Sequence, residues 1–244
     1  MSTLLAFELA TEACSVALSH DGHLLARHEV APRRHAELAL PWAEALLAEA
    51  GLAKSQLDAL AVGVGPGAFT GVRLAISLVQ GIALGLDRPV LPVSTLAALA
   101  EPFLSEGPVL AVIDARMGEL YVGEFAADAE GLPVPRADEA LLSVADAPAA
   151  LRRRAHGGRS EAPIIGVGTG FAAGDGHWAT VLDWPWLRRD DAALPTAGAV
   201  ARIALRNWRL GGAVMADRLE PTYLRDKVAL TSVEQAAARA AKGT

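Results

Sequence analysis

The predicted elements of this 244-residue chain follow one order in the first half and repeat it in the second. Short apolar or alternating runs predict strands, and longer apolar runs with helical spacing predict helices. The first half contains predicted strands at 4–9, 15–19, 23–30, 60–64 and 89–93, and helices at 35–50, 72–86 and 94–104. The second half contains strands at 109–114, 119–125 and 163–167, and helices at 143–154 and 196–210. The repeat favours an α/β fold made of two similar lobes.

The two copies meet at Glu106-Gly107-Pro108, which interrupts both patterns and marks a lobe boundary. We expect an N-terminal, partner-binding lobe at 1–106 and a C-terminal lobe at 107–231, with the last segment of that lobe free to pack back on the first. Residues 232–244 are expected to form a frayed or disordered tail. The plan of three strands, helix, strand and helix, with a glycine-rich loop after the fourth strand, is that of the actin, sugar kinase and heat-shock ATPase (ASKHA) superfamily. The predicted fold class is a duplicated actin-like α/β fold, with a mixed sheet and helices in each lobe.

Charge and cysteine content exclude several classes of protein. The formal net charge of −6 argues against a protein that binds nucleic acid on its own, because nucleic-acid affinity needs a large basic surface. A single cysteine, Cys14, excludes a disulfide framework and a cysteine-rich zinc site. Residues 1–10 lack the pattern of a secretion signal, and helix 72–86 falls short of the ~20 residues of a membrane span. We therefore expect a cytoplasmic protein with no membrane contact.

The densest motif is the segment 65–73, Gly-Pro-Gly-Ala-Phe-Thr-Gly-Val-Arg, at a strand-to-helix junction. Glycines permit a tight turn and let backbone N–H groups face a ligand, and a helix N-terminus favours phosphate. The spacing is neither that of a P-loop nor that of a dinucleotide fingerprint. A purely structural turn and a nucleotide or phosphate site both stay open here. The candidate residues for such a site are Thr11, Gly65, Gly67, Thr70, Gly71 and Arg73.

The same segment is similar to the GPGSFTGLR signature of the TsaB (YeaZ) family. Four other segments, at 10–18, 92–96, 114–121 and 220–228, resemble that family in order and spacing. The resemblance implies a non-catalytic paralogue of TsaD, the subunit that transfers threonylcarbamoyl to the tRNA adenosine next to the anticodon. It implies a dimerization or scaffold subunit whose partners are a TsaD-like paralogue and a TsaE-like ATPase, with tRNA bound only through the complex. It also implies no intrinsic cofactor, allows ATP or ADP near the partner interface, and leaves a homodimer open when the partner is absent.

Residue chemistry points the same way. None of the six histidines forms an HxxxH or HExxH pair, so we expect no metal site and no catalytic residue. Glu8 ends the first strand, where phosphotransferases of the superfamily carry an Asp that holds a metal-bound water. An ASKHA-type small-molecule kinase or ATPase that uses Glu8 is the alternative, and a peptidase ranks last. Asp114 and Arg116 are expected to form a local salt bridge without chemistry.

Helix 72–86 is apolar around nearly its whole circumference, so it needs cover on more than its core side. Ser77, Gly81 and Gly85 align at intervals of four, which would let a second helix approach closely. One interpretation is that helix 35–50 covers this surface within the lobe. The other, favoured by the resemblance, is a partner interface formed by Leu74, Leu78, Gly81, Ile82 and Gly85.

Overall fold

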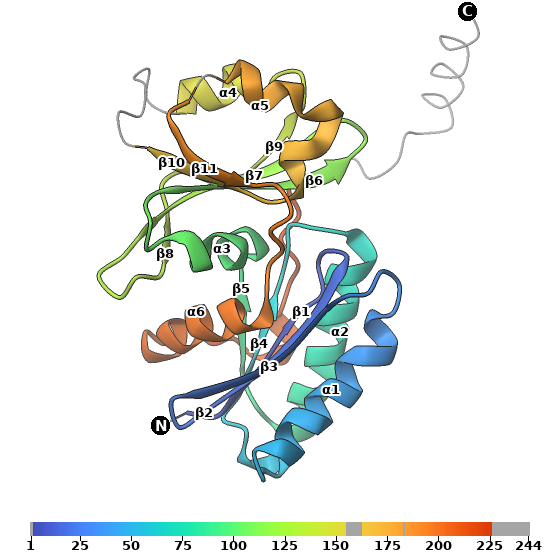
Figure 1. Ribbon diagram of the computed structural model, residues 1–244. Coiled ribbons are helices and arrows are strands. Elements are labelled where there is room, and N and C mark those ends of the chain that lie inside the picture. Colours follow the sequence, from blue (N-terminus) through green and yellow to red (C-terminus); the bar gives the residue numbers. More distant parts are fainter. Residues whose placement is uncertain (1, 155–162, 183, 226–244) are drawn as a thin grey trace, which may run out of the picture.

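The computed structural model describes residues 2–154, 163–182 and 184–225, which form two lobes (Figure 1). The first lobe contains a five-stranded sheet in the order β3-β2-β1-β4-β5. Its strands are β1 (Leu4–Glu8), β2 (Ala13–His20), β3 (His23–Val30), β4 (Ala59–Gly63) and β5 (Val90–Val93). β1 lies antiparallel to β2 and parallel to β4, so the sheet is mixed.

The second lobe repeats this plan in a six-stranded sheet. Its path is β11-β10-β6-β7-β8, and β9 also pairs with β7. The strands are β6 (Val109–Arg116), β7 (Glu119–Ala127), β8 (Pro133–Pro135), β9 (Ala140–Ser143), β10 (Ile164–Val167) and β11 (Trp186–Asp190). β6 is antiparallel to β7 and parallel to β10, as β1 is to β2 and β4. The duplicated mixed-sheet fold expected from the sequence is confirmed.

Helices separate and cover the two sheets (Figure 1). The α-helices are α1 (His35–Glu49), α2 (Phe69–Leu86), α3 (Thr95–Ala100), α4 (Ala147–Arg154), α5 (His177–Val181) and α6 (Ala197–Arg209). Short 3₁₀ segments are η1 (Lys54–Gln56), η2 (Glu101–Phe103), η3 (Thr169–Gly176), which is interrupted by a kink, and η4 (Ala216–Arg218). α1 and α2 pack on one face of the first sheet and α6 on the other, α3 lies between the sheets, and α4 and α5 lie on the far side of the second sheet.

The alternation of β1 explains this layering. Leu5 and Phe7 join the apolar cluster under α1 and α2, whereas Leu4 and Ala6 join a cluster shared with α3, α6 and the second sheet. Side chains of a strand point to opposite faces in turn, so a fully apolar strand must be covered on both sides. The two lobes therefore share one core around α3 and α6, which makes that side of the molecule the joint between them.

The helices do not follow the division at residue 106 that the sheets follow. α6, late in the chain, packs on β1 and β2 of the first sheet, and α3, early in the chain, packs on β6, β7 and β8 of the second. Each helix begins with a hydroxyl cap, Thr196 for α6 and Ser94 for α3, and these residues also begin the two helices expected from the sequence. The tail at 232–244, and residues 226–231 before it, lie outside the described residues.

Several predicted boundaries are wrong. The helix expected at 94–104 ends as α3 at Ala100, where Pro102 helps to convert the chain to η2. The helix expected at 143–154 begins only at Ala147, because Ser143 belongs to β9. The helix expected at 72–86 begins three residues earlier, at Phe69, and is 18 residues long. α2 is thus closer to membrane-spanning length than the sequence indicated, and by length and composition alone it is apolar enough to span.

Candidate functional site

A cleft of about 900 Å³ opens between the lobes. Its walls come from the β1–β2 turn, the starts of α1 and α2, the β6–β7 hairpin and the chain at 222–225. Of the candidate nucleotide residues, Thr11, Gly67, Thr70 and Gly71 line this cleft, whereas Gly65 and Arg73 do not. Four of the six candidate residues therefore lie together at the cleft, and the other two make contacts elsewhere.

Gly67 and Gly71 allow the start of α2 to pack closely against the backbone of the β1–β2 turn. A Cβ added at Gly67 would collide with the carbonyl oxygen of Ala10, and one at Gly71 with that of Leu9. The backbone N–H of Ala68 donates to the Ala10 oxygen at 2.7 Å. The start of α2 is thus seated on the β1–β2 turn through backbone contact, and this observation favours the structural interpretation of the loop.

Gly65 has a different role. Its φ of +94° lies in the region that favours glycine. Its N–H donates to the hydroxyl of Thr95 at 3.2 Å, and its carbonyl accepts from the Thr95 N–H at 2.9 Å. The glycine-rich loop is therefore held to the start of α3 by a pair of hydrogen bonds.

Glu8 lies inside the first lobe and does not line the cleft. One carboxylate oxygen accepts from the N–H of Ala10 at 2.8 Å and the other from the hydroxyl of Thr95 at 3.1 Å. The carboxylate fills the space over Gly63, where a Cβ would collide with it. Burial raises the pKa of Glu8 to about 7, although these hydrogen bonds lower it in part. The glutamate side chain is longer than the aspartate of the superfamily's phosphotransferases, and the sequence left open whether it reaches a ligand. In the structure the Glu8 side chain points into the protein interior.

Arg73 is held by aromatic rings. Its guanidinium carbon lies 3.2 Å from the ring centre of Phe69 and 5.2 Å from that of Tyr223. Its Nη1 atom is buried without a hydrogen-bond partner among the described residues. Arg73 therefore links α2 to the chain near residue 223.

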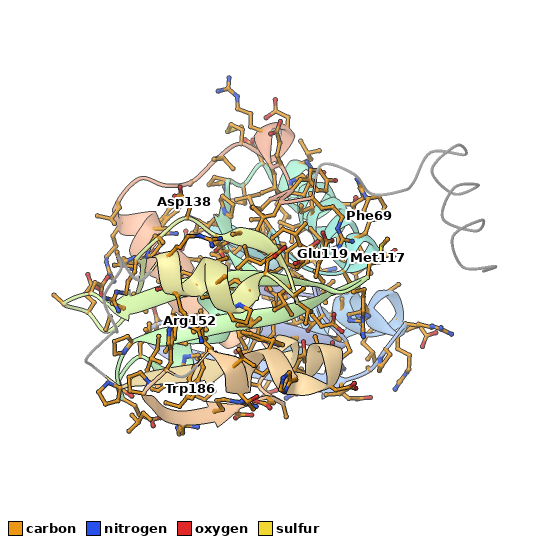
Figure 2. The ribbon with its side chains drawn as sticks, turned by 90° about the horizontal axis from the view of Figure 1, so that it is seen from above. Phe69, Met117, Glu119, Asp138, Arg152 and Trp186 are labelled. Carbon is orange, nitrogen blue, oxygen red and sulfur yellow. The ribbon has the colours of Figure 1, made fainter. Side chains whose placement is uncertain are left out.

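The far wall of the cleft is the β6–β7 hairpin. Arg116 pairs with Asp114 at 2.9 Å, which confirms the local salt bridge expected from the sequence. Figure 2 shows Met117 and Glu119 of this hairpin on the same side of the molecule as Phe69, whereas Asp138, Arg152 and Trp186 lie on the other side. The described residues contain no group of three or more His, Cys, Asp or Glu side chains placed to hold a metal ion.

Residues 214–225, which we call the strap, run along the first lobe into the cleft wall. The sequence analysis allowed the last segment of the second lobe to pack back on the first and used 220–228 for the family resemblance, but it predicted no particular contact for these residues. Its irregular backbone carries no periodicity, so only its motif could have drawn attention to it.

The outer face of α2 is open. A Cβ at Gly81 or Gly85 would meet no described atom within 4 Å, and the Leu84 side chain is 67% exposed. Leu74, Leu78 and Ile82 are half-buried beside this strip. The opposite face, with Ala75 and Val79 among its residues, is buried against the first sheet. The interpretation that α1 covers the whole of α2 within the lobe is therefore wrong, because the two helices lie on the same face of the sheet and leave this strip bare.

The chain is similar to several known proteins. A family model described as "TsaD: tRNA N6-adenosine threonylcarbamoyltransferase" matches residues 28–173. The Escherichia coli "tRNA threonylcarbamoyladenosine biosynthesis protein TsaB" is 38% identical over 93% of this chain and 96% of its own length. The Haemophilus influenzae protein of the same name is 35% identical over 93% and 94%. The solved structure "YeaZ from Pseudomonas aeruginosa" is 40% identical, with a TM-score of 0.80, and the match covers 92% of this chain and 100% of that one.

Proposed function

This chain belongs to the TsaB family, and from that membership we infer that it takes part in the biosynthesis of threonylcarbamoyladenosine on tRNA. We propose that it does so as a non-catalytic dimerization and scaffold subunit that pairs with a TsaD-like catalytic paralogue. The observation that carries this proposal is the bare apolar strip of α2, notched at Gly81 and Gly85.

The strip has the properties of a helix-docking surface. Leu84 is largely exposed, and Leu74, Leu78 and Ile82 border it with half-buried apolar side chains. Contiguous exposed apolar surface on a folded protein marks an interaction site, because water contact with it is unfavourable. The glycines remove the side chains that would keep a second helix at a distance, so a partner backbone can approach closely.

The interior of the cleft supports a subunit without its own chemistry. Phosphotransferases need a carboxylate that points at the metal and phosphate. The carboxylate of Glu8 is instead buried and accepts hydrogen bonds from the Thr95 hydroxyl and the N–H of Ala10. The glycines of the loop serve backbone packing against Leu9 and Ala10. These two observations weigh against the kinase or ATPase alternative, and no contact in the described residues favours it.

The remaining partners follow from the same proposal. A net charge of −6 suits a subunit that meets tRNA only through its complex. A TsaE-like ATPase and ATP or ADP near the TsaD contact complete the assembly, which we place in the cytoplasm. When the partner is absent, we propose that two copies of this chain form a homodimer through their α2 strips.

The test is Gly81→Leu. A Cβ at this position meets no described atom within 4 Å and Gly81 is exposed, so we expect the leucine side chain to fill the notch with the thermal transition nearly unchanged. Co-purification with the TsaD-like paralogue should be lost, together with threonylcarbamoyladenosine on tRNA in cells. Ala149→Leu, which adds the same side chain to an exposed position of α4, is the matched control and should leave both intact. A normal complex with the Gly81→Leu protein would refute the proposal.

A further inference from the structure

The strap joins the first lobe to the second on the cleft side of the molecule. At its start, Val214 and Val90 exchange two backbone hydrogen bonds of 2.8 Å, which extend the edge of the first sheet. The side-chain amide of Gln80, on α2, then donates to the carbonyl oxygens of Ala216 at 2.9 Å and Leu219 at 3.3 Å. These contacts fix the first part of the strap to α2 and β5.

The middle of the strap crosses the glycine-rich loop. The N–H of Thr222 donates to the carbonyl of Val64 at 2.8 Å, and the Thr222 oxygen lies where a side chain at Gly65 would touch it. The next residue, Tyr223, presents its ring to the guanidinium of Arg73. The strap is therefore in contact with the segment that begins α2, at the entrance of the cleft.

The last described residue of the strap reaches the other lobe. Arg225 donates to the carbonyl oxygen of Ala115 at 3.0 Å and pairs with the carboxylate of Glu119. Both acceptors belong to the β6–β7 hairpin, and the Arg225 side chain is only 17% exposed. On the other side of the molecule the lobes share the core around α3 and α6, so Arg225 closes the cleft opposite that joint.

Two charged donor atoms of this arrangement lack an acceptor within residues 2–154, 163–182 and 184–225. Nη1 of Arg73 and Nε of Arg225 are both buried without a hydrogen-bond partner among the described residues. A buried donor without an acceptor costs free energy, and a charged donor costs more than a neutral one. The docked strap is therefore less stable than its contacts alone would make it. One unsatisfied atom belongs to Arg73, which contacts Tyr223 of the strap, and the other to Arg225, the last described residue of the strap.

We propose that the strap is a releasable latch that sets the angle between the two lobes, with Arg225 as its positioning residue. Docking of Arg225 on Ala115 and Glu119 holds the hairpin against the first lobe and keeps the cleft narrow. Release of that contact exposes the unpaired Nε of Arg225 and lets the lobes move about the shared core. Because Gln80 and Arg73 lie on α2, the latch also fixes the helix whose outer face we assign to the partner, and this last step rests on the proposed function.

The angle between the lobes can be measured directly. Cysteines at Ser55, in the first lobe, and Ala149, in the second, are exposed and carry spin labels without disturbing the strap. The native Cys14 is buried, so labelling is confined to the introduced sites. Double electron–electron resonance then gives the distance distribution between the labels in the complete chain. A narrow distribution is expected for the otherwise unchanged protein.

Arg225→Ala should broaden this distribution or move its centre by more than about 2 Å, the scale of a domain rearrangement. Arg225→Lys, which keeps one charged donor, should restore much of the narrow distribution. Arg209→Ala removes an exposed arginine paired with Glu130 outside the strap, and it should change nothing. An unchanged distribution in a folded Arg225→Ala protein would overturn the proposal. If that variant does not fold, Glu119→Gln decides in its place by the same criterion.

The partner step has a separate readout. If the latch and the proposed function are both right, Arg225→Ala should change the affinity for the TsaD-like paralogue severalfold as well as the label distances. If the distances change and the affinity does not, the latch stands and its link to the partner face is refuted. If the unaltered protein binds no such paralogue, the proposed function fails while the distance measurement still tests the latch.

Discussion

The hydroxyl of Thr95 donates a hydrogen bond to the carboxylate of Glu8 across 3.1 Å and so ties the end of β1 to the start of α3. The neighbouring residue, Ser94, donates its hydroxyl to Glu139, which precedes β9 of the second lobe. Burial raises the pKa of both carboxyl groups. Two adjacent residues at the joint thus hold one carboxyl group from each lobe, the buried Glu8 and the half-buried Glu139.

The stability of the protein should depend on pH through Glu8. Its folded pKa of about 7 lies above the usual value of 4.5, so the folded state keeps the proton where the unfolded state releases it. The contribution of Glu8 is therefore fully favourable below pH 4.5, declines as the pH rises towards 7, and stays lost above that. Glu8→Gln, which cannot ionise, should lose this decline. The check is the free energy of unfolding by urea from pH 5 to 8, and equal slopes for the two proteins would contradict the assignment.

Two glycines of α2 should respond to alanine in opposite directions. Gly71→Ala places a Cβ against the Leu9 carbonyl and should destabilise the protein by about 1–3 kcal/mol, the usual cost of overpacking. Gly81→Ala meets open space in the middle of a helix and should stabilise it by about 0.5–1 kcal/mol. Urea denaturation of the two variants provides the measurement. A tolerated alanine at Gly71 would show that the loop is not seated on the β1–β2 turn.

Thr95→Val keeps the shape of the side chain and removes its hydroxyl. The Gly65 N–H then loses its acceptor and Glu8 loses a donor, and each unsatisfied buried group costs about 1–3 kcal/mol. Thr180→Val is the control, because the Thr180 hydroxyl bonds the His177 carbonyl on the exposed surface of α5 and its loss should cost no more than about 0.5 kcal/mol. Equal free energies of unfolding for the two variants would argue against the Glu8–Thr95 bond.

Leu84→Lys should separate binding from stability. Leu84 is 67% exposed on the α2 strip, so lysine there should change the free energy of unfolding by no more than about 0.5 kcal/mol. Affinity for the TsaD-like paralogue, measured by calorimetry, should fall by at least about tenfold, because a charge would be buried in the contact. Leu210→Lys, at a 76% exposed leucine just after α6, is the matched variant that should bind normally. Equal affinities for the two variants would exclude the strip from the interface.

The sequence predicted the parts of the fold that local patterns encode. Strand β1 and helix α1 follow from apolar spacing, and Gly51, with a φ of +67°, ends α1 as expected from its position. β11 was missed because Leu187, Arg188 and Arg189 give it an exposed, charged character. β8 was missed because prolines stand at both its ends, which is tolerated only at a sheet edge.

Four of the six candidate site residues lie together as the sequence suggested, but the structural role of the glycines among them could not be predicted. Thr11, Gly67, Thr70 and Gly71 do gather at one cleft, as a strand-to-helix loop of this kind would place them. Gly67 and Gly71 lack the Cβ that would collide with the carbonyl oxygens of Ala10 and Leu9. These carbonyl groups lie more than fifty positions earlier in the chain, and no local pattern reveals such a contact. Long-range backbone approach of this sort is visible only in the folded chain.

The return of α6 to the first sheet governs how the protein can be synthesised. Leu4 and Ala6 of β1 share a core with Val200 and other residues of α6, which the ribosome adds about two hundred residues later. Until then the nascent first lobe exposes an uncovered apolar sheet face, a surface that chaperones bind. A fragment cut at residue 106 should therefore aggregate, and adding a peptide that spans α6 should rescue its solubility.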